Sequence, residues 1–430
     1  MASLDAEPAV TLRRQLSTLS AAMFGLSYIC PTVVISTFGV IAIRSGGASA
    51  LSYLIATVAM VLTATSYGRM AARYPEAGSA YTYVSRVLNP TLGLVVGWVL
   101  ILDYFFIPAV ICLITGKALE VLWPGSSFRV WVVVVAALAT GVNLLGIKVA
   151  DRVNLTIMTA QLAAVAALWF LCARSNVDFS LLPFHVSAAS SVMAGAAIAC
   201  YSFLGFDAVS TLSEETVDPT RSIPRATILA AGSAGLIFVV TVYLMTLVHP
   251  SLAFADIDNA GFEILQGATG KTFSALFTCV LIVSNLAALV CAQAGCSRLL
   301  YVMARDDKVP RRFFGYLSPR FRTPSLTIGL MGVVMLLGEA LDVDMATSCV
   351  NFGAFSAFLT VNICVVALRT GIIARVLAAA GAAASIWLIF SLSRMALTVG
   401  IVWLLIGVCY VAYQRRRGMA ASVVSVAVEP

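Results

Sequence analysis

Runs of about twenty apolar residues follow one another along almost the whole chain, from about Thr18 to Tyr413. A helix of that length spans the ~30 Å hydrocarbon core of a bilayer. Only short polar segments separate the runs, so the chain has no stretch long enough for a separate soluble domain. We therefore expect one all-α integral membrane domain, although a length of 430 residues would allow about three soluble domains.

The runs predict about twelve transmembrane helices. Their approximate ranges are 18–43, 48–70, 92–118, 130–149, 153–173, 189–213, 226–248, 272–303, 325–341, 346–368, 372–391 and 395–413. Charged residues make up only 11% of the chain, against about 25% in soluble domains. We assign residues 17–414 to a single membrane domain and residues 1–16 and 415–430 to two cytoplasmic tails.

The orientation follows from the lysines and arginines. Segments on the same side as the N-terminus hold twenty of them, whereas the opposite loops hold six: Arg44, Lys117, Arg129, Arg174, Lys271 and Arg394. Because cytoplasmic loops carry the excess of positive charge, both termini are predicted to be cytoplasmic. This bias also accounts for the net charge of +7 without a nucleic-acid partner.

Soluble-enzyme and metal-binding motifs are missing from the sequence. The chain has two histidines, His185 and His249, both in predicted outer loops, and its ten cysteines form no C-x-x-C pair. No G-x-S-x-G or phosphate-binding loop occurs. We therefore expect no enzyme activity, no metal and no cofactor.

Two stretches interrupt otherwise apolar spans. One is "FGLSYICPTVV", from Phe24 to Val34 in the first span, and the other is "YSFLGFD", from Tyr201 to Asp207 in the sixth. Transporters built from two inverted repeats begin each repeat with a discontinuous helix that binds substrate. The spacing favours a fold of two inverted repeats at about 17–173 and 189–368, with discontinuous helices 1 and 6 and two extra helices at about 372–413. The alternative is close helix packing at the glycines and a simple kink at the proline.

The breaks supply most of the candidate substrate-binding residues. They are Gly25, Ser27, Tyr28 and Cys30 in the first span, and Tyr201, Phe203, Leu204, Gly205, Phe206 and Asp207 in the sixth. Aromatic side chains among them would offer ring faces to a cation.

Acidic residues inside the spans are the other candidates, because a charge at the centre of a membrane helix costs ~2.5–3.5 kcal/mol. Asp103 lies ~17 Å into its span, and Tyr104, which follows it, is a further substrate-binding candidate because its ring could face a cation. Asp103 would bind an ammonium group, carry a coupling proton, or serve only as a structural hydrogen-bonding group. Asp207 and Glu214 are seven residues apart and would share one helix face, which predicts an acidic track towards a cytoplasmic gate.

Glu215 is the last candidate for coupling or for the cytoplasmic gate. For both glutamates the alternative is an ion pair with Arg221 or Arg225 at the membrane edge, and for Glu215 this alternative is favoured.

Three stretches resemble the amino acid–polyamine–organocation transporter superfamily. They are "RYPEAGSAYTYV" (73–84), "SFLGFDAVSTLSEETVDPTRSIPRA" (202–226) and "SRLLYVMARDDKVPRRFFGYLSPRFRTP" (297–324). Within it, "GLSYICP", "TFG", "LDYFF" and "FLGFDAVSTLSEET" are most similar to bacterial putrescine importers. The resemblance implies the LeuT-like 5+5 inverted-repeat fold, a bacterial inner-membrane location, proton-driven uptake, and a central site to which Asn285 and Asn351 contribute.

The sequence departs from the resemblance at two positions. Gln161 occupies the place where some members carry a lysine that substitutes for a sodium ion. Ser36 stands where an acid is expected in a close relative of the putrescine importers.

The turn at the first break indicates the substrate class. Amino-acid carriers of the superfamily usually have a G-S/T-G turn there, whose backbone N–H groups bind a carboxylate. Here Pro31, which we expect to start the second half-helix, has no N–H. The free carbonyls of the first half-helix, with Asp103 and Asp207, suit an ammonium group instead.

We therefore expect a proton-coupled importer of a small organic cation, such as putrescine or a related polyamine, that works by alternating access. The partners are the amine or amino-acid substrate, protons and the lipid bilayer; no oligomeric state follows from the sequence. The alternatives are an amino-acid permease, an amine/amino-acid exchanger, a channel and a sensor that does not transport.

Overall fold

The computed structural model describes residues 12–123, 125–175, 179–180, 182–186, 188–257, 259–337, 343–368 and 371–416. Within these ranges the regular structure is helical, apart from one isolated bridge between Leu16 and Thr216. The helices are α1 (Thr18–Ile29), α2 (Val33–Arg44), α3 (Ser49–Arg73), α4 (Ser79–Val87), α5 (Pro90–Leu122), α6 (Phe128–Leu144), α7 (Ile147–Arg174), η1 (Leu182–Phe184), α8 (Ala189–Tyr201), η2 (Phe206–Leu212), α9 (Pro219–Val248), α10 (Ala260–Arg305), α11 (Arg311–Phe314), α12 (Ser325–Leu337), α13 (Val343–Ala367), α14 (Ile372–Phe390) and α15 (Arg394–Arg416).

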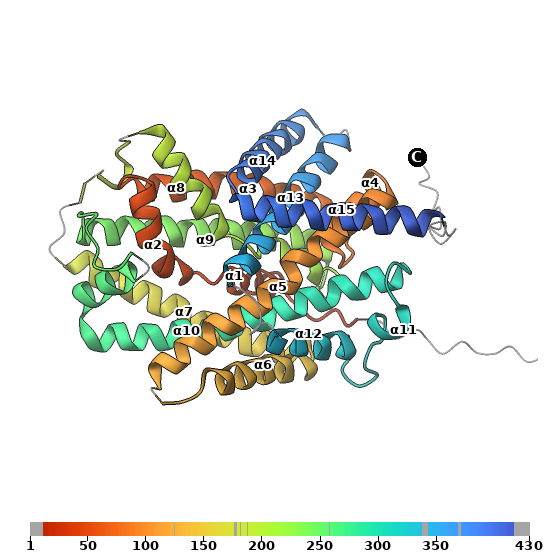
Figure 1. Cartoon of the computed structure of the whole chain (residues 1–430), viewed down its shortest axis with the longest axis horizontal. Coiled ribbons are helices and arrows are strands. Elements are labelled where there is room, and N and C mark those ends of the chain that lie inside the picture. The colour runs from red at the N-terminus through yellow and green to blue at the C-terminus, as the bar shows by residue number, and fades with distance from the viewer. Residues whose placement is uncertain are drawn as a thin grey trace, which may run out of the picture.

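Long helices such as α9, α10 and α15 run along the long axis of the molecule (Figure 1). In the described ranges, nine helical segments are long and apolar enough to cross a membrane, and the bent pair of α1 and α2 raises the number to ten. The shorter apolar helices α6 and α12 occupy the places of the fourth and ninth predicted spans. The all-α membrane architecture is thus confirmed, whereas the count of twelve spans remains a prediction.

Some predicted segments fall partly or wholly outside the described residues. These are positions 1–11 of the first tail, 338–341 of the ninth span and 417–430 of the second tail. The described part of the first tail packs against the membrane domain, because Leu12 and Leu16 are buried and Leu16 bridges to Thr216.

The boundary between the fourth and fifth spans differs from the prediction. The fourth span was expected to end near residue 149, but α6 ends at Leu144 and α7 begins at Ile147. Gly146 lies between them with φ 101°, in the left-handed region that favours glycine after a helix end. Hydropathy did not reveal this turn because apolar residues flank it on both sides.

The first predicted break is present, and α1 and α2 meet at an angle of 50°. Cys30 adopts a left-handed conformation, and its N–H donates to the carbonyls of Leu26 and Ser27. Pro31 was predicted to start the second half-helix, but α2 begins two residues later, at Val33. The reason is a turn through Pro31 and Thr32, which is closed by a 2.8 Å hydrogen bond from the Val33 N–H to the Cys30 carbonyl.

The second predicted break is also present. After α8 the chain turns through 202–205 and continues as η2, which is a 3₁₀-helix. Gly205 has φ 112°, and a Cβ there would lie 2.7 Å from the ring of Tyr28. Only glycine therefore lets the second break pack directly on the first.

The 3₁₀ geometry corrects the predicted acidic track. With 3.0 residues per turn, positions seven apart do not share a face. Asp207 and Glu214 therefore do not line one helix side, as they would in an α-helix, and Glu214 lies beyond the end of η2.

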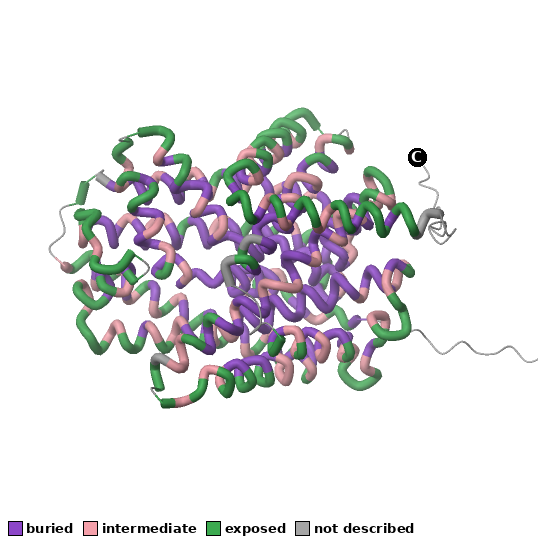
Figure 2. Tube along the Cα trace, viewed as in Figure 1, coloured by how far each residue is buried: buried purple, intermediate pink, exposed green. Residues whose placement is uncertain are grey.

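Buried residues concentrate where the helices cross in the middle of the molecule (Figure 2). Large apolar side chains on α14, including Ile372, Ile373 and Phe390, are more than 70% exposed. Such residues match the apolar solvent of a bilayer. Helices α4 and α11 and the C-terminal end of α15 lie together at one end, called the α11 end below (Figure 1).

Candidate functional site

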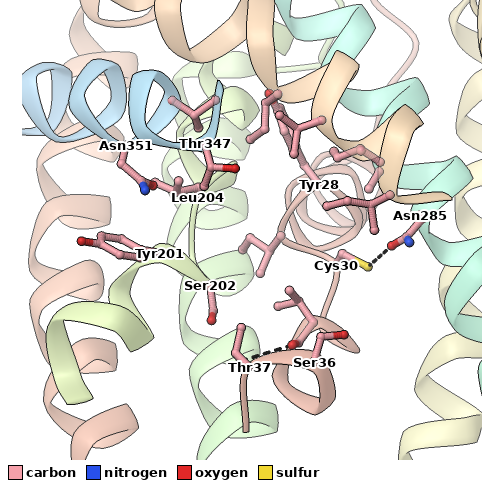
Figure 3. Close-up of a pocket in the computed structure, with 18 of the residues that line it drawn as sticks. Tyr28, Cys30, Ser36, Thr37, Tyr201, Ser202, Leu204, Asn285, Thr347 and Asn351 are labelled. Atoms are coloured by element: carbon pink, nitrogen blue, oxygen red, sulfur yellow. Dashed lines mark hydrogen bonds between the residues drawn. The ribbon is translucent and has the colours of Figure 1, made fainter. Parts of the chain in front are cut away.

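A cavity of about 400 Å³ lies beside the two helix breaks and is completed by α5, α10 and α13. Four predicted site residues line it, Tyr28, Cys30, Tyr201 and Leu204. Figure 3 shows Tyr201 and Asn351 on one side of the cavity and Cys30 and Asn285 across from them. Both asparagines implied by the family resemblance are therefore at the cavity.

Amide and hydroxyl groups supply the polar part of this cavity. The Cys30 thiol donates to Asn285 Oδ1 at 3.4 Å. Asn351 is buried, and its Oδ1 has no hydrogen-bond partner within the described ranges. Ser36 lines the cavity and is exposed, so a hydroxyl stands where the resemblance leads us to expect an acid.

Gln161 holds the turn of the first break. Its side chain is buried on α7, and Nε2 donates to Thr32 Oγ1 at 2.9 Å. The Thr32 hydroxyl also lies 3.4 Å from the Cys30 thiol. At the position where some superfamily members carry a lysine, this chain thus has an amide that fixes the conformation of the cavity wall.

We expect Gln161→Leu to lower stability by about 1–3 kcal/mol, because it leaves the buried Thr32 hydroxyl without its strongest partner. The measurement is the apparent melting temperature of the purified protein. Thr159→Val is the matched control on the same helix, since the Thr159 hydroxyl is exposed and bonds only to the Leu155 carbonyl. Equal melting temperatures for Gln161→Leu and the wild type would contradict this role.

Two predicted acids lie next to the cavity rather than in its lining. Asp207 is buried at the start of η2 and accepts a 2.8 Å hydrogen bond from the Tyr104 hydroxyl. Asp103 is only 4% exposed, and its carboxylate accepts no hydrogen bond from the described part of the chain. Gly353 of α13 packs on Asp103, where a Cβ would lie 2.9 Å from the Asp103 backbone nitrogen.

Tyr28 lies between the cavity and the start of η2, since it lines the cavity and its ring packs on Gly205, two residues before Asp207. Asp103 also lies one turn before Ile107 on α5, and Ile107 lines the cavity. The acid pair therefore adjoins the cavity at its end nearest the breaks.

Other predicted site residues serve as packing. Phe203 stands edge-on to Phe238, and Phe206 contacts the rings of Tyr67 and Phe358. Ser27 is buried, and the space at Gly25 is filled by Val209 of η2. These contacts fix the two breaks, and neither Phe203, Phe206, Ser27 nor Gly25 is among the lining residues.

The sequence interpretation missed an apolar wall on α5. It consists of Ile107, Val110, Ile111 and Ile114. These positions repeat at three- and four-residue intervals after Asp103, which places them on one helix face. That periodicity was available as a signal, but in a uniformly apolar span it does not stand out.

Ion pairs join the second break to α10 at the α11 end. Arg305 donates to both carboxylate oxygens of Glu214 at 2.9 Å, and Glu214 also accepts from the Ala77 N–H at 3.2 Å. Glu215 pairs with Arg298, and both side chains are buried.

The alternative of pairing to Arg221 or Arg225 is therefore wrong for both glutamates. The residues after η2 turn towards α10, whereas Arg221 lies within 4.0 Å of Asp218 at the start of α9. The same end holds a bond from the Tyr81 hydroxyl to Asp306 Oδ2 at 2.8 Å. Burial and the Asp306 charge raise the pKa of Tyr81, so its hydroxyl keeps the proton it donates.

Comparison with known proteins identifies the family. The amino acid permease family matches residues 20–428. The chain is 35% identical over 426 residues to the low-affinity putrescine importer PlaP of Escherichia coli (strain K12), with 94% of each chain covered. It is 26% identical to the branched-chain amino acid permease BcaP of Bacillus subtilis (strain 168), with 94% of each covered, and 24% identical to the methylthioribose transporter of the same strain, with 95% of each covered. The chain therefore belongs to the amino acid permease family of the amino acid–polyamine–organocation superfamily, and it is a multi-pass membrane transporter rather than an enzyme.

Proposed function

We propose that this transporter imports putrescine or a related polyamine, coupled to protons, by alternating access across a bacterial inner membrane. The observation that carries the proposal is the buried Asp103 carboxylate, which accepts no hydrogen bond in the described part of the chain. A carboxylate that is buried without a partner is stable only when it binds a cation or a proton. Asp103 is such a group, and it adjoins the cavity beside a second buried acid, Asp207.

The turn of the first break supports a cation over a carboxylate. Pro31 has no N–H, and the N–H groups of Val33 and Ile35 are used in bonds to the carbonyls of Cys30 and Thr32. Few donors are thus left for a substrate carboxylate. In addition, none of the lining residues is a lysine or arginine that would pair with one.

The two ends of the structure differ in a way that supports alternating access. Ion pairs tie Glu214 and Glu215 to α10 at the α11 end, which we assign to the cytoplasm because it carries the excess of positive charge. The cavity reaches the exposed residues Ser36 and Thr347 on the other side of the breaks. We infer an outward-facing state with a closed cytoplasmic gate.

Similarity adds to this assignment, because the relative PlaP is named as a low-affinity putrescine importer. The α5 wall of aliphatic side chains suits the methylene chain of a diamine.

The test is uptake of labelled putrescine by proteoliposomes with an imposed inward proton gradient. Accumulation should require the gradient and should stop when a protonophore collapses it. Saturation of the rate with concentration separates a carrier from a channel. Uptake of amino acids that excess diamine leaves unchanged would overturn the proposal.

The second candidate is an amino-acid permease. It is favoured by the lack of any charged residue in the cavity lining and by similarity to BcaP, named as a branched-chain amino acid permease. In the same assay, leucine or valine would compete with uptake if this candidate were correct.

A further inference from the structure

A small cavity of about 130 Å³ lies at the α11 end, away from the candidate substrate cavity. Four segments that are far apart in the sequence form it: the strand-like segment before α1, the turn between α6 and α7, the loop after η2, and the loop before α12. Its basic lining residues are Arg13, Lys148, Arg320 and Arg322.

These four cations are not neutralised by neighbours. None of them forms an ion pair within the described ranges, and Arg320 instead stacks over the ring of Phe321 at 5.1 Å. The acid at the cavity, Glu215, is already paired with Arg298. Four basic side chains around one cavity, none with an ion-pair partner of its own in the described ranges, favour the binding of an anion.

The backbone adds to this preference. Gly146 and Ile147 line the cavity at the start of α7, which is 28 residues long. Gly146 provides no side-chain cap. The first N–H groups and the positive end of the α7 dipole are therefore available to an anion beside the arginines.

The chemistry indicates a phosphate group. Arginine guanidinium groups match the geometry of phosphate oxygens, and several of them around one small cavity would bind one phosphate. A cavity of about 130 Å³ has room for a single tetrahedral oxyanion.

We propose that this basic cavity binds a phosphate-bearing anion, either inorganic phosphate or an anionic lipid headgroup, and that the anion holds the α11 end closed. The segment before α1 is tied to the loop after η2 by the Leu16–Thr216 bridge and by hydrogen bonds from the Gln15 and Leu16 N–H groups to the Glu215 carbonyl. An anion bound here would connect that pair of segments to α7 and to the loop before α12. These segments must separate when the cytoplasmic gate opens, so the anion would slow transport; this effect, unlike binding, rests on the proposed alternating access.

The binding test uses the full chain in a neutral detergent, with inorganic phosphate as the probe and chloride at matched ionic strength as the reference. Phosphate should raise the melting temperature of the wild type by mass action. The double variant Arg320→Ala/Arg322→Ala should lose this shift. The control Arg311→Ala/Arg312→Ala removes two exposed arginines of α11 outside the cavity and should keep it.

A single variant, Lys148→Gln, repeats the binding test if the double variant fails to fold. If the α11 control lost the shift equally, the proposal would be overturned, because phosphate would then bind to positive charge spread over the surface and not to this cavity. If phosphate does not raise the melting temperature of the wild type, binding of inorganic phosphate is overturned. The proteoliposome experiment below then tests the lipid headgroup.

The second arm distinguishes the two sources in proteoliposomes. Phosphate enclosed in vesicles of neutral phosphatidylcholine, or phosphatidylglycerol added to the bilayer without phosphate, should lower the uptake rate of wild type by about 5-fold, a common size for allosteric coupling. The addition that lowers the uptake rate identifies the source of the phosphate group. Lys148→Gln should weaken the effect of that addition. No effect of either addition, together with no thermal shift, would overturn the site. If putrescine proved not to be the substrate, the thermal arm would still report on the site.

Discussion

Asp103→Asn is expected to reduce putrescine uptake by about 100-fold or more while the protein still folds. Asparagine keeps the volume of the side chain but carries neither a negative charge nor a titratable proton. Removing one partner of a buried ion pair costs ~3–5 kcal/mol, and every 1.4 kcal/mol is a factor of ten. Because Asp103 is the buried carboxylate without a hydrogen bond in the described structure, its loss should fall on substrate or proton binding rather than on folding.

The control for this variant is Asp151→Asn. Asp151 lies on α7, away from the cavity lining, and accepts a 3.1 Å hydrogen bond from the Ser20 hydroxyl. It should retain most of the uptake rate and an unchanged dependence on the proton gradient. Wild-type uptake in Asp103→Asn would return Asp103 to a structural role and would remove the main support for a cationic substrate.

The positions of both breaks could be predicted because they depend on local chemistry. Proline lacks an N–H and glycine tolerates left-handed conformations, so both mark places where a helix cannot continue. The structure places left-handed residues at both breaks, Cys30 in the first and Gly205 in the second. What the sequence did not reveal is the exact start of α2, because the bond from the Val33 N–H to the Cys30 carbonyl inserts a turn after the proline.

The partners of the acids could not be predicted, because they are tertiary. Glu214 and Arg305 are 91 positions apart, and Glu215 and Arg298 are 83 apart. The local alternatives, Arg221 and Arg225, were nearer in sequence but lie on α9, beyond the turn that follows η2. An α-helical spacing rule also failed there, since η2 has the tighter 3₁₀ geometry.

The cavity was predicted only in part for a related reason. Tyr28, Cys30, Tyr201 and Leu204 were found because they belong to the breaks. The α5 wall lies on an unbroken apolar helix, where lipid-facing, buried and cavity-lining positions have the same composition. Only the packing of α5 against the breaks and α13 distinguishes these positions.

The buried pair of Glu215 and Arg298 gives the prediction with the largest expected effect on stability. Glu215→Gln should destabilise the protein by ~3–5 kcal/mol, because it leaves the Arg298 guanidinium buried without a counter-charge. The double variant Glu215→Leu/Arg298→Met removes both charges and should recover most of that stability. Arg86→Gln is the control for an exposed pair, since Arg86 and Glu76 are 3.0 Å apart at the surface and such pairs contribute ~0.2–1 kcal/mol. Thermal unfolding of the purified variants measures all three.

If Glu215→Gln and Arg86→Gln unfold at the same temperature, the pair does not hold the α11 end closed. If the double variant regains stability but transports substrate from the cytoplasmic side faster than the wild type, the ion pair itself slows the opening of the cytoplasmic gate.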